Sequence, residues 1–571
     1  MQDKVKATQH ITDILLKYDI DTIFGIVGIP VVELADSFIA NNIRFISFRN
    51  EQSASYAASV YGYLNNKPGI LLTVGGPGLI HSLAGIYNSI ENKWPLIVLT
   101  GSIESTDQYK HGFQELDHVS LLHRHINFTA KLSLENIDRC FYEAMRNSCL
   151  INKGVSFIEI PGDLFHSTIS TDVIDKSIVH QPISKKLIEY QPTDELITKV
   201  SKFLLENINK NKKNCLVVIG DGAMDDSQKL TKFLTHFNLP FITTPMARGI
   251  VPDSSKLNVA SARSLALKNA EIVLLIGTKL NWILHFGSSS KWNENTLFIQ
   301  IDNSPSNLGL NNSKGLEYSL FGNISVTLDK LSRSLIKFNK NKQWRYQGPT
   351  ENIKIKIKEN EINLKKKESN HSTSQLNYNE VYGSLRKILN DRETIIVMEG
   401  ANTMDIARIS FKTDYPQHRL DCGNLATMGV GLGYAISAKL SRPDKTVVLI
   451  QGDSAFGFSG MEIETAVRNK LGLIIIVMNN SGIYKGVPIE ERKSDKALPS
   501  TALTQDCRYD IVGKGLGANG YLIRDLNQLD KFFKLAVQRS KVNKETSILN
   551  VILEPGKQKK LSFGWQTKAR L

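Results

Sequence analysis

Two polar residues in the last third of the chain stand where ligands bind in open α/β sheets. Asp453 follows the apolar run 445–451, and Asn480 follows the apolar run 473–479. Both runs are short, rich in β-branched residues and bounded by turn residues, which is typical of buried parallel strands. Because residues 459–471 between them have helical spacing, we expect a β-α-β unit whose crossover brings both strand ends to one edge of a sheet.

That edge has the chemistry of a magnesium site. Ligands of open α/β sheets bind at the carboxyl ends of the strands. The side chains of Asp453 and Asn480 and the backbone carbonyl of Gly482 are hard oxygen ligands, which suit Mg²⁺. Magnesium held by so few protein groups normally takes its remaining ligands from phosphates and water. The alternative is an ordinary β-α-β unit in which Asp453 and Asn480 are turn residues.

A glutamate near the N-terminus is the second candidate for chemistry. Glu51 follows a strand predicted at 43–48 and precedes an Ala/Ser-rich helix expected at 53–64. A carboxylate at that place either stabilises the start of the helix through the helix dipole or acts as a dry acid–base group. The residues alone leave both interpretations open.

Small and polar residues open a further predicted helix near residue 400. The segment 399–405 follows the predicted strand 394–397 and places Asn402 and Thr403 at the start of the helix. Such a helix N-terminus either cradles a phosphate group or is simply capped by these side chains.

The elements that must position these residues alternate strand and helix three times along the chain. We predict an α/β fold of three doubly wound parallel-sheet domains, at residues 1–170, 190–335 and 376–571. A lysine-rich segment, 336–375, joins the second domain to the third and is expected to be a solvated linker. The central domain has glycine-ended strands but no full Gly-x-Gly-x-x-Gly, so an adenine nucleotide, either ADP or part of coenzyme A, is only a weakly indicated ligand there.

Composition excludes several classes of protein. The chain has 571 residues and contains no run of about 18 uncharged apolar residues, so no membrane span is expected. Its N-terminus lacks an apolar signal core, which argues against secretion. Five scattered cysteines without a Cys-x-x-Cys pair indicate reduced thiols and no structural zinc. The formal net charge is +14, but the lysines of 337–367 have no interleaved aromatic residues, so we expect no nucleic-acid partner.

The pattern Gly452-Asp453-Ser454 followed by Asn479-Asn480 resembles the Gly-Asp-x…Asn-Asn motif of thiamine-diphosphate (ThDP) enzymes, with Ser454 where many members have glycine. The whole chain resembles the 2-hydroxyacyl-CoA lyase and oxalyl-CoA decarboxylase branch of these enzymes. The segments that carry the resemblance span all three domains: 25–31, 49–59, 75–78, 280–287, 399–408, 428–435 and 452–465.

The resemblance implies ThDP and Mg²⁺ as cofactors, bound between an N-terminal pyrimidine domain and a C-terminal diphosphate domain. Glu51 would bond the N1′ atom of the aminopyrimidine, and Met428 would bend ThDP into its reactive shape. The other expected cofactor contacts come from loops around these two residues and around the metal: Ile29, Tyr378, Ala401, Asn402, Thr403, Ala426, Thr427, Asp453, Ser454, Ala455, Asn480, Gly482 and Ile483.

The activity implied is cleavage of a 2-hydroxyacyl-CoA, as in fatty acid α-oxidation, to formyl-CoA and an aldehyde shortened by one carbon. Oxalyl-CoA decarboxylase, which releases carbon dioxide, is the alternative. Decarboxylases of the branch tend to carry Tyr-Glu where this chain has Phe113-Gln114, so Gln114 favours the lyase. Arg263 and Arg408 are candidate coenzyme A contacts. Tyr484 and Ser562 are candidates for a mobile cover of the site.

Three other functions remain as rivals. A flavin- or nicotinamide-linked oxidoreductase would carry a bound chromophore. A non-catalytic member of the fold would be expected to lack Glu51, Asp453 or Asn480, and all three are present. An acetolactate synthase-like activity is the near alternative, but segments 280–287 and 399–408 favour the branch that uses coenzyme A.

The resemblance also implies partners and a location. ThDP sites of this architecture lie between the N-terminal domain of one subunit and the C-terminal domain of another, so we expect a homodimer or homotetramer. The last residues, Ala569-Arg570-Leu571, resemble the peroxisomal address that an import receptor recognises at a C-terminus. We therefore expect a peroxisomal protein, with the cytoplasm as the alternative.

Overall fold

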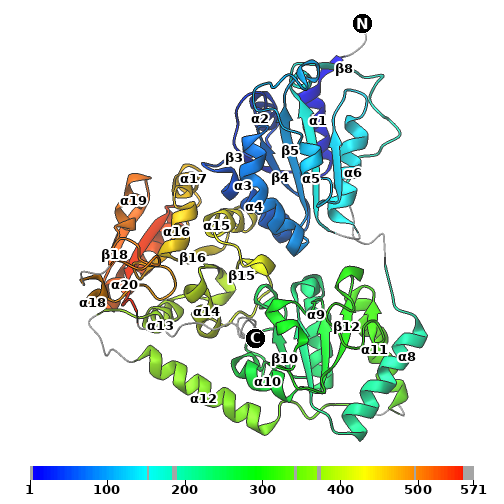
Figure 1. Ribbon diagram of the computed structural model, residues 1–571, viewed down its shortest axis with the longest axis vertical. Coiled ribbons are helices and arrows are strands. Elements are labelled where there is room, and N and C mark those ends of the chain that lie inside the picture. The colour runs from blue at the N-terminus through cyan, green and yellow to red at the C-terminus, as the bar shows by residue number, and fades with distance from the viewer. Residues whose placement is uncertain are drawn as a thin grey trace.

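The computed structural model describes residues 4–150, 153–182, 189–339, 344–369, 375–493 and 497–556. Three parallel sheets, with helices packed against them, follow one another along the chain (Figure 1). This arrangement confirms the predicted fold class. In Figure 1 the N-terminal domain, in blue and cyan, lies at the top, with the green central domain and the yellow-to-red C-terminal domain below it.

The N-terminal sheet has six parallel strands in the order β3-β2-β4-β5-β7-β6. These strands are β2 (Thr22–Gly25), β3 (Arg44–Ser47), β4 (Gly69–Thr73), β5 (Leu96–Ser102), β6 (Phe128–Lys131) and β7 (Val155–Pro161). The helices of the domain are α1 (Ala7–Lys17), α2 (Val32–Ala40), α3 (Glu51–Asn65), α4 (Pro77–Asn92), α5 (His118–Leu122), α6 (Ile137–Cys149) and α7 (Gly162–Phe165). Strand β1 (Lys4–Lys6) pairs antiparallel with β8 (Thr168–Ser170). Every residue of β4 is buried, as expected for a strand covered on both faces.

The central sheet has five parallel strands in the order β10-β9-β11-β12-β13. They are β9 (Cys215–Ile219), β10 (Phe241–Thr243), β11 (Ile272–Ile276), β12 (Leu297–Asp302) and β13 (Ser319–Phe321). The helices of this domain are α8 (Asp194–Leu205), α9 (Ser227–Phe237), α10 (Arg263–Asn269) and α11 (Ile324–Phe338).

The C-terminal sheet has six parallel strands in the order β15-β14-β16-β17-β19-β18. They are β14 (Thr394–Glu399), β15 (Arg419–Leu420), β16 (Thr446–Gly452), β17 (Ile474–Asn479), β18 (Asn519–Ile523) and β19 (Ser547–Ile552). The helices are α13 (Tyr378–Ile388), α14 (Ala401–Ser410), α15 (Gly431–Ser441), α16 (Asp453–Ser459), α17 (Glu462–Arg468), α18 (Ile489–Arg492), α19 (Tyr509–Gly515) and α20 (Leu526–Val542). Strands β16 and β17 are neighbours, as the predicted β-α-β unit requires.

The crossover between β16 and β17 differs from the single helix predicted at 459–471. Helix α16 begins at Asp453, directly after the strand, and a second helix, α17, begins at Glu462. The early start has a local cause: the Asp453 carboxylate accepts the N–H of Ser454 at 2.9 Å, and an acidic residue is favoured in the first helical turn. The metal-ligand candidate therefore sits at a helix N-terminus rather than in a free loop.

The lysine-rich segment between the second and third domains contains a helix, α12 (Glu351–Glu368), which runs below the C-terminal domain toward the lower part of the central domain in Figure 1. Ile353 is its one buried residue. Asn360 donates to the Ser261 carbonyl of the central domain at 2.8 Å, and Glu368 accepts from Arg386 of α13 at 2.8 Å. The linker expected to be solvated thus keeps its lysines at the surface while its helix contacts both neighbouring domains.

The N-terminal and C-terminal domains of one chain pack through α3 and α15. A Cβ atom at Gly433 of α15 would lie 2.7 Å from the Ser53 carbonyl oxygen of α3, so glycine is what allows this approach. Beside it, Asn88 of α4 donates to the Tyr434 hydroxyl at 2.7 Å. The largest hydrophobic core includes side chains from both domains, such as Phe24 and Tyr434. In the part of the chain that the structure describes, no helix combines the length and apolar character of a membrane span.

Candidate active site

The three predicted metal ligands lie together at the carboxyl edge of the C-terminal sheet. The N–H of Gly482 donates both to Asp453 Oδ2, at 3.0 Å, and to Asn480 Oδ1, at 3.2 Å. Asp453 and Asn480 are 3% and 1% exposed. The oxygen donors that the sequence places 27 residues apart therefore meet around one backbone amide.

The electrostatics of this pocket suit a divalent cation. Burial raises the pKa of Asp453 to about 6, against the opposing effect of backbone N–H groups from Ser454, Gly482 and Ser481. No ion pair among the described residues neutralises Asp453. Because a buried carboxylate without a cationic partner costs free energy, a bound Mg²⁺ would stabilise its charged form. The donor set thus fits the cation that the sequence predicts.

A candidate phosphate-binding surface adjoins the candidate metal ligands. Helix α14 begins after Gly400, whose φ of +95° turns the chain sharply, and a Cβ there would lie 3.3 Å from the Gly452 nitrogen. The first residues of α14 are Ala401, Asn402 and Thr403, and the latter two are buried. Free N–H groups at a helix N-terminus attract anions, so this surface fits a diphosphate. The candidate cofactor residues 401–403 are thereby brought beside Asp453.

Tyr378 joins the two parts of this surface. Its hydroxyl accepts from Asn480 Nδ2 at 3.4 Å. Burial, with a smaller contribution from the Asp453 charge, raises the pKa of Tyr378, while its hydrogen bond with Thr403 lowers it. The neighbouring Tyr382 donates to the Thr403 carbonyl at 2.8 Å. The sequence-predicted contacts Tyr378, Thr403 and Asn480 therefore form one connected network.

Glu399 holds the loop that carries Met428. The sequence by itself gives this residue no role. Both carboxylate oxygens of Glu399, at the end of β14, accept backbone N–H groups, one from Gly429 and one from Gly431 at 2.8 Å. Burial raises the pKa of Glu399 to about 7, although these N–H groups oppose the rise. Glu399 thus sets the position of the loop that carries Met428.

Tyr56 links that loop to the helix that begins with Glu51. The Tyr56 hydroxyl lies 2.9 Å from Thr427 Oγ1 and 3.3 Å from the Met428 carbonyl oxygen. Before Thr427, Ala426 adopts the left-handed conformation, with φ of +53°. Tyr56 therefore contacts the segment expected to bind the aminopyrimidine, 426–428, and Glu399 holds the glycines that follow it.

Glu51 is the first residue of α3 and is mostly buried, with its side chain 14% exposed. Its Oε2 atom lies 3.4 Å from Nδ1 of His81 on α4. The chain just before it is held by the carboxylate of Glu462, which accepts the Arg49 N–H at 3.2 Å. Burial raises the pKa of Glu462 to about 7. The N-terminal domain thus presents Glu51 on a backbone that the C-terminal domain secures.

Other loops of the N-terminal domain carry Ile29 and Gln114. Gln114 adopts φ of +58°, and its backbone packs against Gly76 at the start of α4. Ile29 lies in the loop after β2 and is 75% exposed. Within the described residues, neither side chain makes a hydrogen bond or ion pair that would assign its role, so both roles stay predictions.

The two arginines expected to contact coenzyme A lie near each other at the boundary of the central and C-terminal domains. Burial, and then the nearby positive charge of Arg408, lowers the pKa of Arg263. Arg263 donates to the Ile283 carbonyl at 2.7 Å, and Arg408 to Asp405 at 2.6 Å. Nε of Arg408 is buried without a hydrogen-bond partner. Among the described residues Arg408 pairs with both Asp405 and Asp421, so Arg263 is the better suited of the two to an anionic ligand.

The remaining candidates surround the metal ligands. Ser454 and Ala455 lie in the first turn of α16. Ile483 and Tyr484 follow Gly482 and are 37% and 62% exposed, and the Tyr484 carbonyl accepts from Asn480 at 2.8 Å. Ser562 lies outside the described residues.

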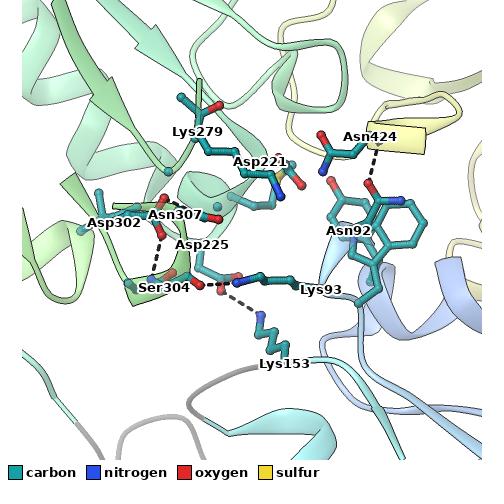
Figure 2. Close-up of a pocket in the computed structure, with 18 of the residues that line it drawn as sticks. Asn92, Lys93, Lys153, Asp221, Asp225, Lys279, Asp302, Ser304, Asn307 and Asn424 are labelled. Atoms are coloured by element: carbon teal, nitrogen blue, oxygen red, sulfur yellow. Dashed lines mark hydrogen bonds and ion pairs between the residues drawn. The ribbon is translucent and has the colours of Figure 1, made fainter. Parts of the chain in front are cut away.

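A cavity of about 320 Å³ lies between the N-terminal and central domains. Figure 2 shows Lys93 and Lys153 of the N-terminal domain pointing toward Ser304 and Asp225 of the central domain. Lys279 also lines the cavity. Asp302 ends β12 there, and burial raises its pKa to about 6. The lining also contains Glu91, Asp221, Asp225 and Asp226, so the lysines there are outnumbered by acidic residues and Lys153 pairs with Asp225.

Known proteins resemble this chain along its whole length. Models of the thiamine pyrophosphate enzyme match it in order: the N-terminal TPP binding domain at 5–121, the central domain at 202–331 and the C-terminal TPP binding domain at 399–551. The chain is 53% identical over 566 residues to the 2-hydroxyacyl-CoA lyase of Saccharomyces cerevisiae, covering 99% of both chains. The chain belongs to the thiamine pyrophosphate enzyme family. Thiamine pyrophosphate is the cofactor called ThDP above.

More distant members of the family also align over nearly the full length. The 2-hydroxyacyl-CoA lyase 1 of Homo sapiens is 35% identical over 590 residues, covering 100% of this chain and 98% of the relative. The oxalyl-CoA decarboxylase of Escherichia coli is 32% identical over 566 residues, covering 97% of this chain and 96% of the relative. Membership of the thiamine pyrophosphate enzyme family confirms the resemblance predicted from the motifs and supports ThDP as the cofactor.

Sequence reasoning missed several residues that hold the site together. Glu399 and Glu462 lie in segments 399–408 and 452–465, which carry the resemblance, but the sequence gives neither residue a role. A signal was available for Glu399, because a carboxylate directly after a buried strand and before glycine has to find donors. Tyr56 and His81 carry no such signal, since only the packing of α3 on α15 and α4 brings them to Met428 and Glu51.

Proposed function

We propose that this protein is a ThDP- and Mg²⁺-dependent carbon–carbon lyase that cleaves a 2-hydroxyacyl-CoA into formyl-CoA and an aldehyde shortened by one carbon. The observation that carries the proposal is the meeting of Asp453, Asn480 and Gly482 beside the start of α14. It occurs in a chain 53% identical to a protein named 2-hydroxyacyl-CoA lyase. In this proposal, the 2-hydroxyacyl-CoA is an intermediate of fatty acid α-oxidation.

Each residue of the site has a separate role in the proposal. The oxygens of Asp453, Asn480 and the Gly482 carbonyl hold Mg²⁺, and the N-terminus of α14 binds the diphosphate. When bound, ThDP supplies the electron sink for the broken carbon–carbon bond. Met428 and Glu51 orient its ring system, and Gln114 bonds an oxygen of the substrate. Ser454, Ala455 and Ile483 line the same pocket.

Oxalyl-CoA decarboxylase is the second candidate, because a relative with that name is 32% identical. The pair Phe113-Gln114 favours the lyase. A neutral carboxamide bonds a hydroxyl or carbonyl oxygen as donor or acceptor, whereas the carboxylate of oxalyl-CoA calls for a cationic or purely donating partner. In both reactions Arg263 and Arg408 would receive the phosphates of coenzyme A. Tyr484 and Ser562 would cover the bound substrate.

The proposed active unit is a homodimer or homotetramer in which Glu51 of one copy faces the metal ligands of another. Large apolar side chains near the site support this proposal. Ile29, Phe113 and Tyr484 are 75%, 73% and 62% exposed in the single chain. Large apolar side chains that are exposed in a single chain are often covered by another protein. Light scattering of the purified protein tests the assembly.

An adenine nucleotide such as ADP is proposed to bind in the cavity between the N-terminal and central domains. The lysines that line it, Lys93, Lys153 and Lys279, would contact phosphates, and Asp302 at the end of β12 would contact a ribose hydroxyl. ADP is expected to raise the unfolding temperature of the wild type and to have a smaller effect on Lys279→Ala.

A peroxisomal location is proposed from the final tripeptide Ala569-Arg570-Leu571, which lies outside the described residues. An import receptor would recognise it. A fluorescent fusion that ends in the native tripeptide is expected in peroxisomes, and the same fusion without residues 569–571 in the cytoplasm.

The decisive experiment compares two substrates. Purified protein with ThDP and Mg²⁺ receives either a long-chain 2-hydroxyacyl-CoA or oxalyl-CoA, and aldehyde and carbon dioxide are measured. Aldehyde and formyl-CoA in equal amounts are expected from the first substrate. Asp453→Ala should give neither product. A higher kcat/KM for oxalyl-CoA would replace the lyase with the second candidate.

A further inference from the structure

His118, the first residue of α5, is fully buried and uses both nitrogens of its ring. Its Nε2 atom accepts the backbone N–H of Gly76 at 2.9 Å. Its Nδ1 atom lies 3.1 Å from Oε2 of Glu159. Because Nε2 is an acceptor, the ring is neutral, and its one proton is on Nδ1, directed at Glu159. The surroundings thus select a single tautomer.

Glu159 on β7 is a charged anchor for that tautomer. Its neighbour across the sheet is Lys131 of β6, whose Nζ atom lies 3.2 Å from Glu159 Oε1. Burial favours the neutral carboxyl, but the hydrogen bond with His118 and the charge of Lys131 outweigh it and lower the pKa of Glu159. A charged carboxylate behind an imidazole orients the ring, as in catalytic histidine–aspartate pairs.

The other side of the imidazole controls the loop that carries Gln114. Gly76 adopts φ of +51°, and a Cβ atom there would lie 2.7 Å from the Gln114 carbonyl oxygen. The backbones of Gly76 and Gln114 are therefore in direct contact. The direction of the Gly76 N–H, which His118 accepts, determines how this contact is made.

We propose that His118 is a positioning residue for the reaction: through the Gly76 N–H, its neutral ring holds the backbone of Gln114 in place, while Glu159 and Lys131 hold the ring. The part of this inference that concerns turnover rests on the proposed function, because it takes Gln114 to contact the substrate. The part that concerns the Gly76 amide does not depend on any substrate.

A second proton on the ring would break the arrangement. It would place an N–H of the imidazole against the N–H of Gly76, and two donors repel each other. The charged groups around the ring are Glu159 on β7, which lies against it, Lys131 on β6, which pairs with Glu159, and Asp117, which precedes it in the chain. The arrangement therefore depends on the acceptor atom of a neutral ring.

The test uses three variants of the full-length protein. His118→Leu removes both hydrogen bonds. His118→Gln keeps an acceptor for Gly76 but cannot take up a proton. His123→Gln is the matched control, since His123 directly follows the same short helix, is exposed, and has its ring 3.1 Å from the Ser120 carbonyl oxygen. The readouts are hydrogen exchange of the Gly76 amide in ThDP-free protein, and kcat and KM between pH 5.5 and 8.5.

In His118→Leu we expect the Gly76 amide to exchange about tenfold faster or more, which is the usual effect of losing one buried hydrogen bond. We expect kcat to fall about tenfold while the affinity for ThDP stays unchanged. His118→Gln should keep Gly76 protected and kcat within about threefold of the wild type. His123→Gln should behave as the wild type.

Two results would overturn the proposal. One is a Gly76 amide that exchanges at the wild-type rate in His118→Leu. The other is equal loss of protection in His118→Gln and His118→Leu, which would make the shape of the ring important and not its acceptor atom. If His118→Leu does not fold, Glu159→Gln decides, because it removes the charged acceptor behind the ring, and an unchanged Gly76 exchange rate in that variant would contradict the proposal. If the Gly76 amide exchanges as expected in all three variants but the wild type has no lyase activity, the proposed substrate is refuted and the role of His118 at Gly76 stands.

Discussion

Replacing Glu399 with glutamine should change how the stability of the protein depends on pH. Glu399 is 1% exposed, and its two carboxylate oxygens accept the N–H groups of Gly429 and Gly431. Burial raises its pKa from the ordinary value of 4.5 to about 7. Glutamine has nearly the same shape but takes up no proton, so the variant isolates the free energy of the buried charge.

The magnitude follows from the shift in pKa. A shift of about 2.5 units corresponds to about 3 kcal/mol, since each unit is worth about 1.4 kcal/mol. Because the pKa of Glu399 is raised, the folded state binds more protons than the unfolded state between about pH 4.5 and pH 7. The wild type therefore loses about 3 kcal/mol of unfolding free energy as the pH rises through that window, about 1 kcal/mol of it between pH 6 and pH 8.

Urea unfolding of the ThDP-free protein at pH 6 and pH 8 measures this effect. The amide of Glu399→Gln accepts only one of the two N–H groups, and that cost of about 1–3 kcal/mol is the same at both pH values. The unfolding free energy of the variant, relative to the wild type, should rise by about 1 kcal/mol from pH 6 to pH 8. Glu294→Gln, at an exposed turn, should show no such rise. An equal difference at both pH values for Glu399→Gln would refute the reasoning.

Three further predictions concern the candidate active site. Glu51→Gln should keep ThDP and Mg²⁺ bound, measured by calorimetry, but lose turnover about 100-fold or more, and unchanged turnover would remove Glu51 from the reaction. Gln114→Ala should lower kcat/KM for a 2-hydroxyacyl-CoA about tenfold with ThDP affinity retained, whereas equal loss of both would indicate a structural role. Burial raises the pKa of Asp453 to about 6, so protons should compete with Mg²⁺ below that pH. The Mg²⁺ affinity should then fall about tenfold per pH unit, and a pH-independent affinity would show that another group binds the metal.

Local patterns in the sequence were enough to predict the strands that carry the candidate metal ligands. The runs 445–451 and 473–479 became the neighbouring strands β16 and β17, because β-branched residues between turn residues leave few alternatives to a buried strand. The position of Asp453 and Asn480 at the shared carboxyl edge follows from the parallel pairing of the two strands that a β-α-β crossover joins. Their meeting at the Gly482 amide was therefore predictable from spacing.

Sequence patterns were less informative where contacts with other segments decide whether, or where, a helix forms. The lysine-rich segment shows no apolar stripe, so its helix α12 was not expected, and its contacts with Ser261 and Arg386 come from other domains. The helix after β16 was placed too late because its start depends on the Asp453 carboxylate capturing the Ser454 N–H. In both places a particular hydrogen bond, and not a period in the sequence, determines where the helix lies.

What the sequence determined by itself is the set of chemical groups and the sheet edge on which each one lies. What only the tertiary structure decided is how those groups are held and charged. Tyr56 reaches Met428, Glu462 reaches Arg49 and His118 reaches Gly76 across tens to hundreds of residues. The raised pKa of Glu399 likewise depends on burial by the whole domain. Periodicity reports which face of an element is covered, but the partner that covers it is fixed only when distant elements pack together.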